Sequence, residues 1–116
     1  MTATGVFVLT DLTFSEILDM QRTLQDQYRH KWEPVTPDTG KNKLLWMVGE
    51  MGEVIDIVKK HGGRAASEDP ELRACLVEEM ADVLMYYGDA MLCYGINAEE
   101  LKTAYTEKFR KNMKRW

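Results

Sequence analysis

Hydrophobic residues recur at helical spacing along most of the chain, and turn-forming residues divide this pattern into segments. Thr13 followed by Glu16 is a capping-box arrangement, which predicts that a first helix begins there and continues to about residues 28–32. Prolines and polar residues from Pro34 to Gly40 predict a loop. A second helix is expected over residues 41–60, because a pair of glycines follows it.

The second half of the chain predicts two further helices. Asp69 precedes a proline, which is typical of an N-cap and the first helical residue, so a third helix should run from there to Tyr94. The polar residues 64–68 before it are expected to form a short loop. Asn97 caps a fourth helix that continues towards Met113. Because no alternating stretch is long enough for a sheet, the pattern predicts an all-α, four-helix bundle.

The length of 116 residues fits a single helical domain over residues 13–116, preceded by an N-terminal extension over residues 1–12. A chain this short buries only about two thirds of its unfolded surface, so oligomerisation is a natural way to add core. No apolar run approaches the roughly 20 residues that span a bilayer. The net charge of −4 argues against a nucleic-acid partner. We expect a cytoplasmic protein with reduced cysteines and no membrane partner.

The expected second helix carries a hydrophobic face and an acidic stripe. Trp46, Glu50, Glu53 and Ile57 follow one another at intervals of 4, 3 and 4 residues, so they line one side of a helix. A different face is predicted to belong to the core: Leu44, Met47, Val48, Met51, Val54, Ile55 and Val58.

The expected third helix is apolar around most of its circumference, which predicts that it is buried on nearly all sides. Its one polar stripe contains Glu78, Glu79, Asp82, Tyr86 and Asp89. We therefore expect this stripe to face a narrow cleft.

Acidic residues at helical spacing usually belong to solvated faces, but these two stripes lack basic partners. No lysine or arginine occurs between Leu44 and Val58, or between Ala74 and Leu101. Carboxylates that converge in a semi-buried place repel one another unless they are protonated or bind a cation. Oxygen ligands favour magnesium, manganese or calcium over zinc. A di-iron site is not expected, because neither histidine follows a glutamate by three residues.

Basic residues gather elsewhere in the chain. From Lys102 to Trp116 there are six lysines or arginines against one glutamate, and Lys59, Lys60 and Arg64 follow the second helix. Cations are favoured at helix C-termini, so these residues either form solvated helix ends or bind phosphates next to a metal.

Taken together, these motifs resemble the MazG-like nucleotide pyrophosphohydrolases, which are relatives of the dimeric dUTPases and the all-α dCTP pyrophosphatases. Glu50 and Glu53 match the family's ExxE motif, and Glu79 and Asp82 match its ExxD motif. The ending KFRKNMKRW also resembles the family's, and the resemblance extends over residues 41–116. The chain departs at Gly49, where many MazG proteins have a glutamate.

The resemblance implies magnesium-dependent hydrolysis of a nucleoside triphosphate to the monophosphate and pyrophosphate, with manganese as the alternative ion. It implies that Glu50, Glu53, Glu79 and Asp82 are both metal ligands and catalytic residues. It also implies a homodimer or homotetramer, with active sites that form between chains. The alternative is a non-catalytic helical oligomer that acts as a nucleotide-binding or protein-interaction module. The substrate-binding residues expected are Trp46, Lys60, Tyr86, Lys108, Asn112 and Arg115.

Overall fold

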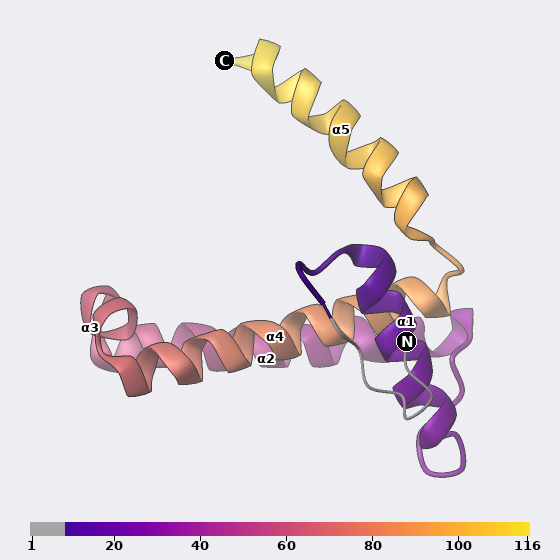
Figure 1. The fold of residues 1–116 in the computed structure, drawn as a ribbon, viewed down its shortest axis with the longest axis horizontal. Coiled ribbons are helices and arrows are strands. Elements are labelled where there is room, and N and C mark those ends of the chain that lie inside the picture. Colours follow the sequence, from indigo (N-terminus) through magenta and orange to yellow (C-terminus); the bar gives the residue numbers. More distant parts are fainter. Residues whose placement is uncertain (1–8) are drawn as a thin grey trace.

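The computed structural model describes residues 9–116, and within that range it is entirely helical, as the sequence predicts (Figure 1). Of the expected N-terminal extension, residues 1–8 lie outside the described residues, and residues 9–12 form no helix. The elements are α1 (Phe14–Gln27), the 3-10 turn η1 (Pro37–Thr39), α2 (Gly40–His61), α3 (Gly63–Glu68), α4 (Pro70–Cys93) and α5 (Ala98–Arg115).

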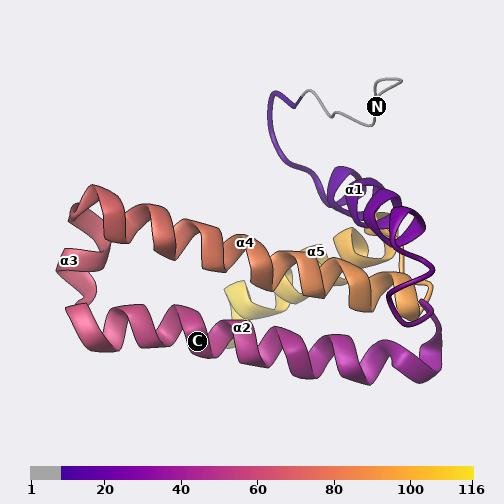
Figure 2. The ribbon, with the colours of Figure 1, turned by 90° about the horizontal axis from the view of Figure 1, so that it is seen from below.

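Two long antiparallel helices, α2 and α4, form a hairpin that dominates the molecule (Figure 2). The short helix α3 closes one end of the hairpin and packs against both. At the other end, α1 crosses α4. The segment between α1 and α2 therefore lies at the open end of the hairpin, next to the first turns of α2.

The expected capping residues set the helix boundaries. The Thr13 hydroxyl accepts a hydrogen bond from the Glu16 amide, and the Glu16 carboxylate accepts one from the Thr13 amide, at 3.2 and 2.9 Å. Asn97 and Glu100 form the same reciprocal pair at the start of α5. The Asp69 side chain caps α4, because its Oδ1 atom accepts hydrogen bonds from the backbone amides of Glu71 and Leu72. Each cap satisfies backbone donors that the first helical turn leaves unpaired.

The prediction of a loop over residues 64–68 is wrong, because these residues belong to α3. Gly62 adopts a φ of +86°, which ends α2 and turns the chain. Residues 63–68 contain two alanines, good helix formers, and Ala66 is buried where α3 meets the hairpin. The polarity of the stretch reflects its outer face, so it did not indicate a loop.

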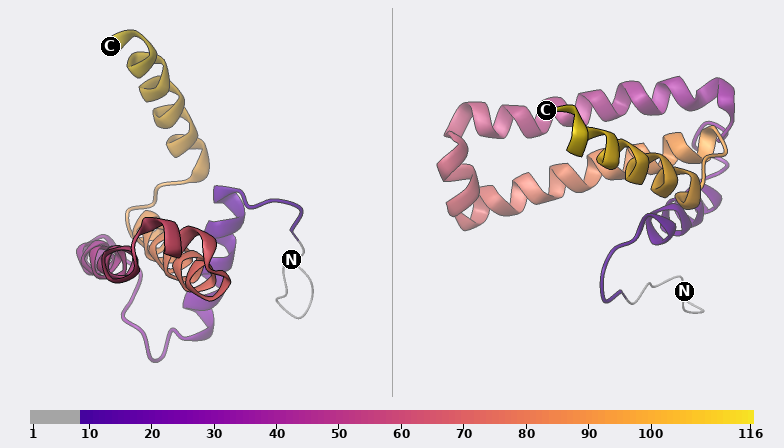
Figure 3. Two further views of the ribbon diagram at one scale, coloured as in Figure 1. Left: turned by 90° about the vertical axis from the view of Figure 1, so that its left-hand side faces the viewer. Right: turned by 90° about the horizontal axis from the view of Figure 1, so that it is seen from above.

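The helix α5 stands away from the hairpin (Figure 3, left). Among the described helices, only α1 has a backbone close to that of α5, and no Cα atom of α2 or α4 lies within 8 Å of one in α5. Its row of large apolar side chains is exposed: Tyr105, Phe109, Met113 and Trp116. The four expected helices are therefore present, but within one chain α5 leaves the hairpin uncovered.

The buried core is small and lies where α1 crosses α4. It includes Ile17 and Leu18 of α1 and Met91 of α4. The expected core face of α2 is exposed within one chain, with Val48 and Ile55 each 61% accessible. The expected near-complete burial of α4 is also wrong in one chain, because no described helix covers the far side of the hairpin. Periodicity identified the apolar faces correctly, but it does not predict what covers them.

Candidate active site and metal centre

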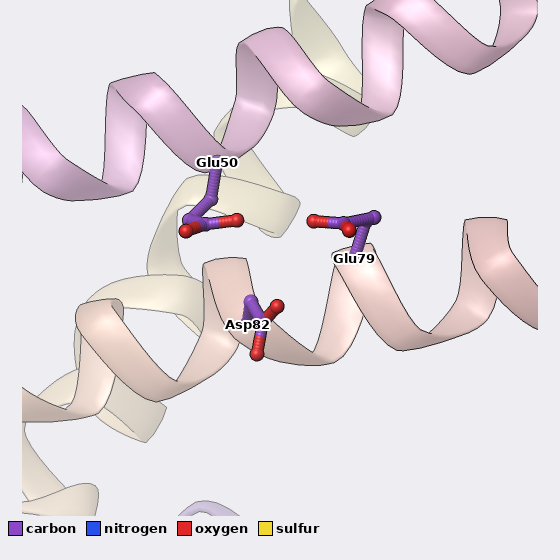
Figure 4. A group of neighbouring side chains, drawn as sticks. All are labelled: Glu50, Glu79 and Asp82. Atoms are coloured by element: carbon purple, nitrogen blue, oxygen red, sulfur yellow. The ribbon is translucent and has the colours of Figure 1, made fainter.

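Three carboxylates converge between the two long helices. Glu50 projects from α2 towards Glu79 and Asp82 of α4 (Figure 4). Each side chain offers one oxygen, and these three oxygens lie within 4.8 Å of one another. All three residues are half-buried. The antiparallel packing of α2 and α4 thus brings together two motifs that are 29 residues apart from Glu50 to Glu79.

The charged form of Glu79 is destabilised by its acidic neighbours. The pKa of Glu79 is raised, first by desolvation, then by a hydrogen bond with Glu50 and by repulsion from Glu50, Asp82 and Glu53. No lysine or arginine in residues 9–116 forms an ion pair with Glu50, Glu79 or Asp82. A set of carboxylate oxygens without a basic partner matches the donor chemistry of magnesium or manganese.

The fourth predicted carboxylate, Glu53, lies at the edge of this group. It is exposed on α2, one turn beyond Glu50, and its charge contributes to the raised pKa of Glu79. It does not join the three oxygens that converge. A carboxylate in this position remains accessible to water and close to the cluster.

A pocket of about 510 Å³ extends from the cluster along the hairpin towards α1. This volume lies within the usual range for sites that hold small molecules. Aromatic, apolar and charged side chains contribute to its walls, which include Gln21, Leu24, Gln25, Lys31, Trp32, Glu33, Lys43, Trp46, Glu50, Asp82, Met85, Tyr86 and Asp89.

The pocket is built in three levels, one helical turn apart. On α2 the successive side chains are Glu50, Trp46 and Lys43, and on α4 they are Asp82, Tyr86 and Asp89. Because the two helices are antiparallel (Figure 2), Glu50 faces Asp82 across the hairpin, and Trp46 faces Tyr86. The Trp46 and Tyr86 rings are 6.0 Å apart at an interplanar angle of 61°. The acidic end and the inner end are therefore separated by about 10 Å, the rise of seven helical residues.

The remaining predicted site residues lie elsewhere in the chain. Lys60 forms a 2.9 Å ion pair with Asp56 on the exposed side of α2, and it does not line the pocket. Lys108, Asn112 and Arg115 lie on α5, which makes no contact with α2 or α4. Within one chain, the structure therefore does not bring these four side chains to the carboxylates.

Sequence reasoning did not single out the inner wall formed by Gln21, Gln25 and Lys43. Lys43 precedes Glu50 by two helical turns on the same stripe, as Asp89 follows Asp82, and this spacing was the available signal. No comparable spacing in the sequence pointed to Gln21 and Gln25. Gln21 donates to Asp89, 68 residues away, and only the crossing of α1 over α4 brings them together.

The fold and the site define an all-α protein in which two antiparallel helices present a carboxylate cluster beside a pocket for a small molecule. The family model of the MazG nucleotide pyrophosphohydrolase domain matches residues 38–115, and the chain belongs to this family. The match contains the whole of α2, α3, α4 and α5. No solved structure matches the chain at a significant level.

Proteins of this family are generally hydrolases that act on nucleotide phosphoanhydrides, and they are typically dependent on a divalent metal. In residues 9–116, no helix combines the length and the apolar character needed to cross a membrane.

Proposed function

We propose that this protein is a magnesium-dependent pyrophosphohydrolase that converts a (deoxy)nucleoside triphosphate to the monophosphate and pyrophosphate. The observation that carries the proposal is the placement of three mutually repelling carboxylates at one end of a pocket of about 510 Å³, in a MazG domain. Manganese has similar ligand preferences and is the alternative ion.

The four carboxylates would have different roles, because they occupy different positions in the site. Glu50, Glu79 and Asp82 would hold the metal, because their oxygens converge. When bound, magnesium neutralises phosphate charge and lowers the pKa of a water molecule. Glu53 is exposed at the edge of the cluster and is the candidate to accept a proton from the attacking water. The new bond joins the water oxygen to the α-phosphorus, the bond from this phosphorus to the bridging oxygen breaks, and pyrophosphate leaves.

The aromatic level of the pocket would position the nucleoside. Trp46 and Tyr86 line the pocket directly beyond the carboxylates, and Trp32, which is stacked on Tyr28, lies at its wall. Aromatic side chains provide flat, apolar surfaces for a base or sugar. Burial, followed by the nearby charge of Glu50, raises the pKa of the Tyr86 hydroxyl, so it would remain a hydrogen-bond donor at neutral pH.

A second copy of the chain is the proposed cover of the hairpin's far side. A groove of about 620 Å³ there is lined by nine residues, all of them apolar: Leu12, Met51, Val54, Ile55, Val77, Met80, Ala81, Val83 and Leu84. Such a surface is unfavourable in water and is typical of an interface. We assign it to a homodimer, or to one interface of a homotetramer.

The same assembly would complete the phosphate site. On α5, Lys108, Asn112 and Arg115 share one flank of the helix, beside the exposed aromatic row. Since α5 does not reach its own hairpin, we assign these side chains to the active site of another copy, where they would bind phosphate oxygens. Lys60 has an exposed partner, Asp56, that it can exchange for a phosphate at little cost.

The test is pyrophosphate release from a panel of nucleoside triphosphates with and without magnesium. Glu53→Gln and Asp82→Asn should each reduce turnover by at least about a hundredfold, as expected for loss of a proton acceptor or a metal ligand. Glu78→Gln is the matched control, because Glu78 is an exposed neighbour outside the converging group. Magnesium should also raise the melting temperature of the wild type but not that of Asp82→Asn. A melting shift without turnover on any nucleotide would instead favour a non-catalytic nucleotide-binding oligomer.

A further inference from the structure

The inner end of the pocket contains a largely buried lysine, and its ammonium group makes no hydrogen bond with residues 9–116. Lys43 is only 3% exposed and lines the pocket. Its Nζ atom lies 3.9 Å from Glu33 Oε1 and 4.8 Å from the centre of the Trp46 ring. The first distance is too long for a hydrogen bond. Lys43 therefore has only a long ion pair with Glu33, and its N–H groups remain available to a ligand in the pocket that offers an acceptor.

A carboxylate faces the same space from the other helix. Asp89 is 5% exposed and lines the pocket, and Gln21 donates to its Oδ1 at 2.9 Å. Gln25 also hydrogen-bonds to it. A carboxylate can accept about four hydrogen bonds, so this group retains acceptor capacity. Lys43 and Asp89 do not form an ion pair within 4.0 Å of each other, although the lysine's charge acts on the carboxyl.

These two groups lie where the base of a nucleotide would end. They are two helical turns, or about 10 Å, from the carboxylates that would hold the metal. Between them stands the aromatic level of Trp46 and Tyr86. A nucleotide whose phosphates lie at the acidic end would extend past these rings and present the edge of its base to Lys43 and Asp89.

We propose that Lys43 and Asp89 select the base, with Lys43 donating to a ring carbonyl oxygen and Asp89 accepting from the adjacent ring N–H. This inference rests on the proposed function. Uracil, thymine, guanine and hypoxanthine carry that carbonyl and N–H side by side. Cytosine and adenine carry an amino group and a bare ring nitrogen in the same places. They would direct N–H at the ammonium and a lone pair at the carboxylate, and both contacts are repulsive.

A purely structural role for this network makes a different prediction. Gln21 and Gln25 belong to α1, so the hydrogen bonds of Asp89 also tie α1 to α4. If that were their whole role, substitutions here would lower stability and reduce activity on every nucleotide to the same extent. A change in the ratio between two nucleotides that differ only at the base edge is the result that a structural role does not produce.

Two matched substrate pairs test the proposal in the wild-type protein. dUTP and dCTP differ only at the edge in question, and so do dITP and dATP. We expect kcat/KM to favour dUTP over dCTP, and dITP over dATP, by about tenfold or more, because a buried polar site rejects a mismatched edge strongly. Equal values, or a preference for dCTP and dATP, would overturn the proposal.

Substitutions test whether Lys43 and Asp89 cause the preference for one base edge. Asp89→Asn and Lys43→Met should each reduce the dUTP to dCTP ratio by about tenfold. The matched control is Lys41→Met, which removes an exposed lysine two residues away and should leave the ratio unchanged. If both site variants fold, as judged by thermal melting, and keep the wild-type ratio, the assignment is wrong. If either variant fails to fold, the ratios of kcat/KM measured for the two substrate pairs in the wild-type protein decide whether the proposal holds.

Failure of the proposed function can be distinguished from failure of this inference. If no nucleotide releases pyrophosphate, the proposed function is wrong, and binding of dUMP and dCMP by calorimetry in the presence of magnesium still reports on the base. Tighter binding of dUMP then supports the assignment of Lys43 and Asp89, and equal or weaker binding contradicts it. If pyrophosphate is released without the expected ratio, only the base assignment fails.

Discussion

At the scale of single residues, the Glu79 carboxyl shows that the site destabilises a negative charge. It is partly desolvated, hydrogen-bonded to Glu50 and repelled by three acidic neighbours, and these effects raise its pKa above the ordinary value of 4.5. A carboxyl whose pKa is raised by folding stabilises the folded protein below its unfolded pKa. That contribution is lost as the pH rises through the folded value. The charged form of Glu79 therefore opposes folding at neutral pH in the absence of a bound cation.

We expect Glu79→Gln to raise the melting temperature of the metal-free protein at neutral pH, because it removes the repelled charge. The gain should shrink as the pH falls through the raised pKa of the wild-type carboxyl, and it should be absent below the ordinary value of 4.5. Thermal melts in chelator across this pH range measure both effects. Glu78→Gln on the adjacent exposed residue controls for removal of one negative charge. A gain that is equal for both variants, or independent of pH, would contradict this account.

Spacing in the sequence located the four acidic residues, because residues three and four apart share a helix face. It did not reveal which of them converge. Glu50, Glu79 and Asp82 do so, whereas Glu53 lies to one side. That distinction depends on the rotation of α2 against α4. The contact of Gln21 with Asp89 was equally hidden, since it requires the tertiary crossing of α1 over α4.

At the scale of elements, the crossing of α1 over α4 depends on a glycine. A Cβ atom at Gly88 would lie 3.0 Å from Ile17 Cγ2 and 3.2 Å from Gln21 Cγ. Ile17 is buried and belongs to the small core, so it has little room to move. Gly88 thus allows close packing of the two helices and places Gln21 next to Asp89.

We expect Gly88→Ala to destabilise the protein by about 1–3 kcal/mol, because overpacking forces α1 away from α4. Gly49→Ala is the comparison, since no described atom beyond its chain neighbours and the backbone of its own helix lies within 4 Å of a Cβ there. That second change should be neutral or stabilise the helix by up to about 1 kcal/mol. Chemical denaturation of both variants measures the difference. Equal free energies of unfolding for the two variants would show that α1 can shift at this crossing without loss of stability.

The start and end signals of the helices were largely readable from the sequence, because caps and glycines act locally. Thr13, Asp69 and Asn97 mark the helix starts that were expected. The short helix α3 was missed, because six polar and small residues carry too little periodicity to distinguish a helix from a loop. Its contacts with α2 and α4 add to the helix preference of its two alanines, and these contacts cannot be read from the sequence.

At the scale of the whole molecule, the pattern of exposure supports the proposed assembly of two or more chains. The periodicity of α2 and α4 predicted more apolar surface than one hairpin can bury, and Val48, Ile55 and Met80 remain more than half exposed. The helical class was therefore predictable from one sequence. The covering of these faces was not, because the sequence does not distinguish a partner within the chain from one in another copy.

We expect Met80→Glu, in the middle of the apolar groove, to convert the protein to single chains in solution, because a buried glutamate without a partner is costly. Leu45→Glu is the control, since Leu45 is a large exposed residue of α2 that does not line the groove. Light scattering coupled to gel filtration measures the mass. An unchanged mass for Met80→Glu would mean that the groove is not the interface.

The separation of α5 from the hairpin makes it possible for two inactive proteins to restore each other's activity. One chain carries Asp82→Asn and keeps its α5, and the other carries Arg115→Ala and keeps its carboxylates. If these parts meet between chains in a dimer, a mixed pair contains one intact site. Unfolding and refolding an equal mixture should then recover about a quarter of wild-type turnover, because about half of the dimers are mixed. If each chain used its own α5, complementation would not occur.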